Sequence, residues 1–252
     1  MRNSKTKTMP TQNANKVNQA WGKRPLPGRG PKPTLSRAEI ARAAIELADA
    51  EGLEAITMQR VACQVGVTTM ALYRYFPAKA DLVDLMIDSA GDSAQNFGKP
   101  TESWSARLKK WAHLCLAIYQ GHPWFLEATS ARHSIMGPNE LLWMEAAMAM
   151  LAESGLGTAD RHSAFLALIG QVRGHATFQQ RRSSGESDEE WSHDLIQMLN
   201  SEASRYPALL KALESGAFSK DPSSAFDFAL DCILDGIRTR VRRKGVKSRR
   251  RP

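Results

Sequence analysis

Apolar residues recur along the chain at the three- and four-residue spacing of a helix, and no segment alternates as a strand does. The first such stripe consists of Ile40, Ala44 and Leu47. It lies between a capping box at Ser36–Glu39 and Gly52, a residue type that commonly ends helices. The pattern predicts a helix between these two signals and an all-α protein as a whole.

Three more helices are predicted before residue 96. Thr57 can cap a short helix that stops at Gly66, and Thr68 can cap another that Pro77 ends. A fourth helix is expected over about 79–95. These four helices form the first predicted helical domain.

The segment Asn-Phe-Gly-Lys-Pro-Thr at 96–101 predicts a domain boundary, because Gly and Pro interrupt helices. Further helical stripes follow it, at about 104–120, 123–131, 137–155, 159–182, 188–199, 207–213 and 222–243. We therefore expect a disordered basic arm at 1–35, helical domains at 36–96 and 101–243, and a basic tail at 244–252.

Composition narrows the class of protein without changing this picture. Hydrophobic residues make up 42% and charged residues 24% of the 252 positions, values typical of soluble globular proteins. The chain has no long apolar segment and no apolar stretch behind its basic start, so neither a membrane span nor a secretory signal is expected. Three widely spaced cysteines favour a reducing compartment, and we expect a cytoplasmic protein.

The net charge of +8 is distributed unevenly. Residues 1–38 and 238–252 each carry nine Lys or Arg and no acidic residue, which leaves a net charge of −10 on the rest. Basic segments without apolar residues are usually disordered and often bind nucleic acid. The alternative is that these segments only keep the protein in solution.

The two short helices that meet at Gly66 have the layout of a helix-turn-helix, a motif that places its second helix in the DNA major groove. The small Ala62 allows the helices to cross closely, and Gly66 can adopt a positive φ in the turn. These two positions alone are weak evidence.

The wider motif is more specific. It comprises Ala-Glu-Gly-Leu at 50–53, Thr57, Ala62-x-x-x-Gly66-Val67 and Leu72-Tyr73-x-Tyr75-Phe76-Pro-x-Lys79. With these residues, positions 36–91 resemble the N-terminal, three-helix helix-turn-helix DNA-binding domain of TetR-family transcriptional repressors. Residues 104–243 also resemble the family's tetracycline-repressor-like C-terminal domain, with His-Pro-Trp at 122–124, Gly-Pro-Asn at 137–139 and the helix around Gly174 in matching order.

Helical geometry divides the recognition helix into two faces. Leu72 and Phe76 share the inner face, and Met70 and Arg74 point away from it. We assign base reading to Thr69, Met70 and Arg74, because arginine can bond guanine through two hydrogen bonds and methionine can contact a thymine methyl group.

Four other residues are predicted to contact phosphates. Thr57, Tyr73, Tyr75 and Lys79 fit this role, which the resemblance also implies. Thr68 lies at the tip of the recognition helix that faces the bases, and Gln59 and Arg60 are secondary contacts. The full predicted DNA-binding set is Thr57, Gln59, Arg60, Thr68, Thr69, Met70, Tyr73, Arg74, Tyr75 and Lys79. The alternatives are that Tyr73 packs only in the core, that Met70 only fills a gap and that Lys79 acts only on the end of its helix.

The second domain carries no HExxH pair, GxSxG elbow or P-loop, so no catalytic residue, metal or cofactor is expected. The resemblance implies an effector pocket there, for which the candidates are Trp111, His113, Trp143, Met144, Met148, Arg173 and His175. It also implies a dimer interface, for which the candidates are Gly170, Gly174, Leu230, Ile233, Leu234 and Ile237.

The favoured hypothesis is a homodimeric repressor that binds a near-palindromic double-stranded operator and is released by an unidentified small molecule. One alternative is an architectural or nonspecific DNA-binding protein driven by its basic arms. Another is an all-helical enzyme or ligand carrier. The sequence does not distinguish a repressor from an activator, and it identifies neither the operator nor the effector.

Overall fold

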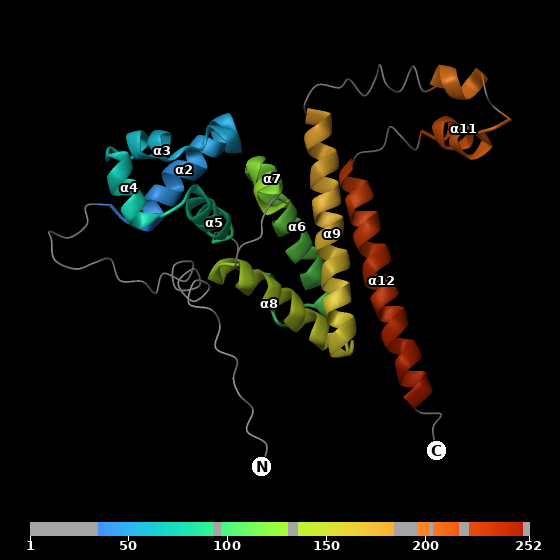
Figure 1. Ribbon diagram of the computed structural model, residues 1–252. Helices are drawn as coiled ribbons and strands as arrows, with labels where there is room; N and C mark the ends of the chain where they lie inside the picture. Colours follow the sequence, from blue (N-terminus) through green and yellow to red (C-terminus); the bar gives the residue numbers. More distant parts are fainter. Residues whose placement is uncertain are drawn as a thin grey trace, which may run out of the picture. The chain divides into compact units, whose positions relative to one another are not determined.

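The computed structural model describes residues 35–92, 97–130, 136–183, 196–201, 204–216 and 222–248. The described residues are mainly helical and include no strand, which confirms the predicted all-α fold (Figure 1). Nearly all of the predicted basic arm, the end of the basic tail and the start of the helix predicted from 188 lie outside these ranges. The chain forms two compact units, the first from 1–96 with 118–146 and the second from 97–117 with 147–252.

The first unit is built on a small helical bundle. Its elements are α2 (Arg37–Glu51), the 3-10 turn η1 (Leu53–Ala55), α3 (Met58–Gln64), α4 (Thr69–Tyr75), α5 (Lys79–Ala90) and α7 (Trp124–Ser130). Helix α2 packs against α3 and α5, and α3 packs against α4 (Figure 1). The wholly buried side chains of Ile40, Leu72, Phe76 and Leu82 come from these helices and form the core of the bundle.

Helix starts in this bundle are fixed by local hydrogen bonds. The Ser36 hydroxyl accepts from the N–H of Glu39 at 3.1 Å, and the N–H of Ser36 donates to Glu39 Oε2 at 2.6 Å. The bonds with Ser36 lower the pKa of Glu39. Ala78 has no side chain able to cap α5, but its N–H donates to Asp81 Oδ2 at 3.0 Å. The sequence signals therefore mark where these helices begin.

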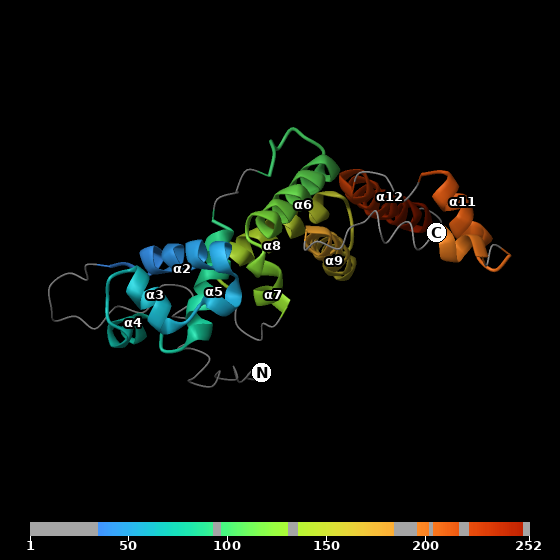
Figure 2. The same cartoon turned by 90° about the horizontal axis from the view of Figure 1, so that it is seen from above.

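The second unit contains most of the long helices. The remaining elements of the chain are α6 (Trp104–Gly121), α8 (Pro138–Glu153), α9 (Thr158–Ser183), α11 (Pro207–Glu214) and α12 (Pro222–Ser248). Helices α9 and α12 lie side by side (Figures 1 and 2). Both α6 and α8 contribute to two units, because the division falls after Ala117 and after Ala146. The segment 118–146, predicted within the C-terminal domain, thus clusters with the helix-turn-helix bundle.

The state of the cysteines and the character of the long helices both bear on expectations from the sequence. The three cysteines Cys63, Cys115 and Cys232 are free thiols, and burial raises the pKa of Cys115 well above its usual value. Among the described residues, no helix combines the length and apolar character needed to cross a membrane.

Candidate functional site

The turn between α3 and α4 is tight and depends on glycine. Gly66 has φ +70°, a left-handed conformation that costs other residue types about 1–2 kcal/mol. The N–H of Val67 reaches back to the carbonyl of Ala62 at 2.9 Å, and Ala62 is 1% exposed. A small residue at 62 and a glycine at 66 therefore set the angle between the two helices.

Helix α4 has one buried face and one exposed face. Leu72 and Phe76 are fully buried, whereas Met70 is 76% and Tyr73 43% exposed, and Arg74 is also exposed. Leu72 and Phe76 therefore supply the buried contacts, and Met70 and Tyr73 present large side chains to the outside, next to the exposed Arg74. This favours a contact role for both residues over purely internal packing.

The two threonines at the helix starts are both N-caps. Thr57 Oγ1 accepts from the N–H of Arg60, and Thr68 Oγ1 accepts from the N–H of Ala71, each at 3.2 Å. A hydroxyl that accepts in a cap keeps its own proton for donation. Each threonine can therefore hold its helix and donate to a phosphate oxygen at the same time.

The remaining predicted contact residues differ in their surroundings. Thr69 and Tyr75 are half-buried, and Gln59 is exposed. Arg60 is paired with Glu51 at 2.5 Å, a bond that raises the pKa of the arginine and lowers the pKa of the glutamate. Arg60 must leave Glu51 or share its guanidinium in order to bind a phosphate.

Lys79 is exposed at the first position of α5. A positive charge at a helix N-terminus opposes the helix dipole, so Lys79 does not stabilise the end of its own helix. Together with Arg60 and Arg74 it makes residues 57–80 a segment with three cations and no acidic residue. This charge suits an anionic partner.

Arg37 is a positioning residue that the sequence analysis missed. Its Nη1 donates to the carbonyl of Tyr75 at 2.6 Å, and its guanidinium lies 4.3 Å from the centre of the Phe76 ring. Burial lowers the pKa of Arg37, while the nearby Asp81 carboxylate acts against this. Arg37 thus ties the start of α2 to the end of α4. Its place directly after the helix cap carried no signal of this long-range role.

The comparisons with known proteins agree with this geometry. The model for bacterial regulatory proteins of the tetR family matches residues 40–86, and the model for the tetracyclin repressor-like C-terminal domain matches residues 97–241. The chain belongs to the TetR family.

Individual relatives of this TetR-family chain cover most of its length. The HTH-type transcriptional repressor DrrR1 of Streptomyces coeruleorubidus is 36% identical over 236 residues, which are 90% of this chain and 86% of that protein. A solved structure of a possible TetR family transcriptional regulator from Streptomyces coelicolor A3(2) is 29% identical, with a TM-score of 0.65, over 81% of this chain and 99% of that one. Family membership confirms the expectation of a transcriptional regulator and not an enzyme.

A third comparison bears on the fold. The Streptomyces coelicolor TetR family protein ActR, solved in complex with actinorhodin, is 23% identical with a TM-score of 0.73, over 83% of this chain and 99% of that one. The TetR-family chain therefore shares its helical architecture with a protein that holds a small molecule.

The predicted effector residues of this TetR-family chain fall into both units. Trp143 and Met144 belong to the first unit, where Trp143 Nε1 donates to the carbonyl of Gly91 at 2.8 Å. The second unit holds the other candidates, which are Trp111, His113, Met148, Arg173 and His175. Trp111 is 1% exposed and its ring lies 6.0 Å from that of Phe165.

His175 is the most unusual of these candidates. Its side chain is 8% exposed, and its buried Nε2 has no hydrogen-bond partner among the described residues. Its ring lies 4.8 Å from that of Phe226, which His113 contacts edge-on at 5.1 Å. Burial, together with the nearby His113, lowers the pKa of His175. The side chain is therefore a neutral hydrogen-bonding group among aromatic rings.

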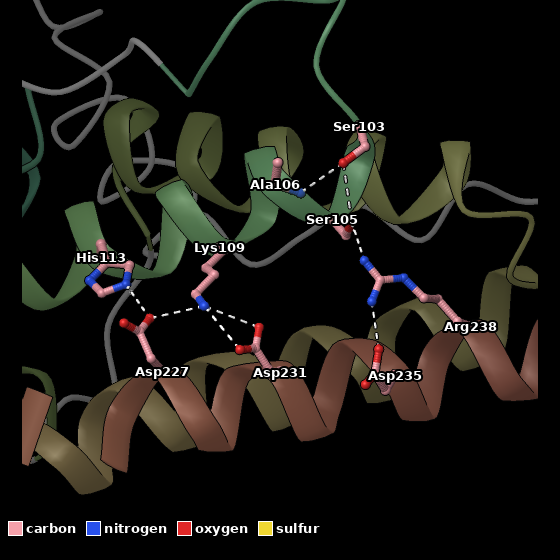
Figure 3. Close-up of polar contacts among 9 residues, drawn as sticks. All are labelled: Ser103, Ser105, Ala106, Lys109, His113, Asp227, Asp231, Asp235 and Arg238. Atoms are coloured by element: carbon pink, nitrogen blue, oxygen red, sulfur yellow. Dashed lines mark hydrogen bonds and ion pairs between the residues drawn. The ribbon is translucent and has the colours of Figure 1, made fainter. Parts of the chain in front are cut away.

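His113 takes part in a polar ladder between α6 and α12, formed by Lys109, His113, Asp227 and Asp231 (Figure 3). Asp227 Oδ1 lies 2.9 Å from His113 Nε2 and 3.2 Å from Lys109 Nζ, and Lys109 Nζ also lies 3.1 Å from Asp231. The bonds with His113 and Lys109 lower the pKa of Asp227. Burial opposes the charge on Lys109, but its bonds with Asp231 and Asp227 raise its pKa. The Nε2 atom of His113 therefore already has a polar partner within the chain.

The predicted dimer residues also divide into two groups. Gly170 and Gly174 are exposed, with nothing within 4 Å of the position that a Cβ would take. Leu230, Leu234 and Ile237 are only 0%, 2% and 6% exposed. These three side chains are core residues of a single chain, so they have little surface left for a partner; Ile233 is half-buried.

Proposed function

We propose that the protein is a homodimeric repressor that binds a near-palindromic DNA operator through α4 and leaves it when a small molecule binds in the second unit. The observation that carries the proposal is the outward face of α4, where Met70, Tyr73 and Arg74 are exposed beside two buried anchors. The repressor assignment is supported by the relative DrrR1, which is described as a transcriptional repressor. Such a protein acts where bacterial DNA lies, in the cytoplasm.

Base reading and phosphate binding are assigned to different side chains. Arg74 and Met70 read base edges, with half-buried Thr69 at the tip of α4 beside them. Phosphates are bound by Thr57, Tyr73, Tyr75 and Lys79, while Thr68 lies at the tip of α4 and Gln59 and Arg60 are secondary contacts. Phosphate contacts position α4 in the groove, and base contacts specify the sequence.

The dimer is proposed to form through an exposed stripe on α9 and α12. On α9 this stripe comprises Leu166, Gly170, Gly174 and Phe178 at every fourth position, and on α12 Phe228, Cys232 and Gly236 at the same spacing. Rows of residues four apart are the ridges by which helices commonly pack. The exposed glycines allow a second copy to approach closely, so we place the α12 contact here and not on Leu230, Leu234 and Ile237.

The effector is proposed to bind among the helices of the second unit. His175 supports this, since an unpaired buried polar atom costs about 1–3 kcal/mol and a ligand hydroxyl can supply the missing bond. Trp111, Met148 and Arg173 remain candidates from the same unit, and His113 is available if its bond with Asp227 opens. Trp143 and Met144 lie in the first unit, so they are not included in this proposed effector site.

The function is tested by selecting bound duplexes from a random DNA pool with the full chain. We expect one preferred, near-palindromic sequence. Arg74→Ala should lose about 1–3 kcal/mol of discrimination at one base pair in each half-site, or about 5- to 150-fold for each. Lys79→Ala is the matched comparison, because loss of a phosphate contact weakens binding to all sequences alike. It should also lower the slope of log affinity against log salt concentration by about one for each protomer.

Two results would count against the proposal. Recovery of unrelated duplexes would favour nonspecific binding by the basic arms, and deleting residues 1–30 and 244–252 would then abolish binding. An unchanged sequence preference in the Arg74 variant would remove that residue from base reading.

A further inference from the structure

Asp88 of α5 caps the start of a different helix. Its side chain is 5% exposed, and its Oδ1 accepts from the backbone N–H groups of Asn139 at 2.8 Å and Glu140 at 3.1 Å. These are the second and third residues of α8, whose first N–H groups have no partner within the helix. A carboxylate at this position satisfies two of them and is favoured by the helix dipole.

Gly137 is required for this cap. A Cβ at this position would lie 2.2 Å from the Asp88 carboxylate, so any other residue would push the carboxylate away. Two further bonds secure the same junction: the Asn139 side chain donates to the Asp88 carbonyl at 3.2 Å, and Trp143 Nε1 donates to the Gly91 carbonyl at 2.8 Å. The start of α8 is therefore fixed on the end of α5.

A second carboxylate binds the two residues on either side of the turn from α6 into α7. Asp49 of α2 accepts at Oδ1 from His122 Nδ1 and from Trp124 Nε1, each at 2.7 Å. A carboxylate only accepts, so His122 carries its proton on Nδ1. His122 directly follows α6 and Trp124 begins α7, so Asp49 fixes the point where the chain turns from one helix into the next.

The two contacts share one arrangement. Helices α6 and α8 contribute to both units. In the first unit, Asp88 binds the start of α8, and Asp49 binds His122, the residue directly after α6, and Trp124 of α7. Asp49 and Asp88 come from α2 and α5, which pack against each other, and α2 also packs against α3 of the helix-turn-helix. A carboxylate of the DNA-binding bundle thus binds the start of α8, and another binds the residue directly after α6.

We propose that Asp49 and Asp88 are the positioning residues through which the second unit and the DNA-binding bundle influence each other. The inference rests on the proposed function, because it names the contacts that carry a signal between ligand and DNA. Hydrogen bonds to a carboxylate are directional and keep α6 and α8 in register with the bundle, so a shift of either helix is passed to α2 or α5. Coupling of this kind is reciprocal in binding free energy, so DNA must shift the same equilibrium of the second unit that the effector shifts.

Reciprocity allows a test without the effector. The probe is the DNA duplex that the full chain selects from a random pool, and the readout is amide hydrogen exchange with and without this duplex. In the wild type we expect DNA to change exchange at 147–153 of α8 and at 104–117 of α6. Asp88→Ala should remove the change at 147–153, and Asp49→Ala should remove the change at 104–117.

Gly137→Ala provides an independent route to the same defect. The added Cβ would lie 2.2 Å from the Asp88 carboxylate and 2.7 Å from Asp88 Cβ, so the variant should separate the start of α8 from Asp88 and show the same loss at 147–153 as Asp88→Ala. Glu145→Gln, an exposed carboxylate on α8, is the matched control and should behave as wild type. Asp88→Asn keeps an acceptor oxygen, so it should lose only part of the exchange response at 147–153. This variant replaces Asp88→Ala in the test if the alanine variant fails to fold.

The outcomes separate the inference from the proposed function. If the wild type selects a duplex but its exchange at 147–153 and 104–117 does not respond, or if the variants respond as wild type does, the inference is wrong and the proposed function stands. If the wild type selects no duplex, the proposed function and the inference fall together. Reduced thermal stability of the variants with an unaltered exchange response means that the carboxylates are structural only.

Discussion

At the scale of single residues, the burial of His175 makes the stability of the protein depend on pH. Burial and the neighbouring His113 disfavour its charged form, so the pKa of His175 lies below its usual value in the folded chain. The unfolded chain binds a proton near pH 6.5, while the folded chain resists it. Stability should therefore be fully present above about pH 6.5 and decline as the pH falls toward the folded pKa.

A urea titration at about pH 7.5 and about pH 5.5 tests this, because the two values lie on either side of the ordinary histidine pKa. We expect the wild-type free energy of unfolding to fall at the lower pH, and His175→Phe to remove part of that fall. Phenylalanine keeps a ring against Phe226 but does not titrate. Because all other side chains are the same in the two proteins, the difference between them reports on His175. Equal pH dependence in the two proteins would contradict the assignment.

At the scale of elements, the helix-turn-helix depends on one turn. Gly66→Ala should destabilise the protein by about 1–2 kcal/mol, because Gly66 has φ +70° and alanine disfavours that conformation. The matched control is Gly121→Ala, since both positions are open to an added Cβ but Gly121 has no positive φ. Urea unfolding followed by circular dichroism measures both variants. A Gly66 variant as stable as the Gly121 variant would show that the turn is not under this constraint.

Local signals explain why these elements could be predicted and others could not. The caps at Ser36, Thr57 and Thr68 lie within a few residues of the bonds that they make, so the sequence shows both partners. Asp49 and Asp88 bond to residues far along the chain, and neither helix carries a sign of this. The clustering of 118–146 with the DNA-binding bundle depends on such contacts and could not be read from periodicity.

Helix α12 illustrates a second limit. This helix has two apolar faces. One carries Leu230, Leu234 and Ile237, and the other carries Phe228 and Cys232. Periodicity shows that the helix has apolar faces but not which of them meets its own chain, and the structure buries the first set. The polar ladder in Figure 3 lies on yet another side, where Arg238 also bonds Ser105 Oγ at 2.6 Å.

At the scale of the whole molecule, the exposed stripe on α9 and α12 leads to a prediction about assembly. Phe228 is 71% exposed in the single chain, an unfavourable position for a large aromatic side chain unless a partner covers it. Phe228→Glu would place a charge in the proposed interface, where its desolvation opposes association. We expect the variant to fold normally but to sediment as a monomer, whereas the wild type sediments as a dimer.

Loss of the dimer should also weaken DNA binding, because the two half-sites of a palindrome are bound together only by linked recognition helices. The affinity for the full selected duplex should fall by about 100-fold or more, while the affinity for a half-site should not change. Met198→Glu is the matched control: Met198 is 69% exposed but lies outside α9 and α12, so this variant should remain dimeric. A Phe228 variant that stays dimeric and binds the full duplex with wild-type affinity would place the interface elsewhere on the molecule.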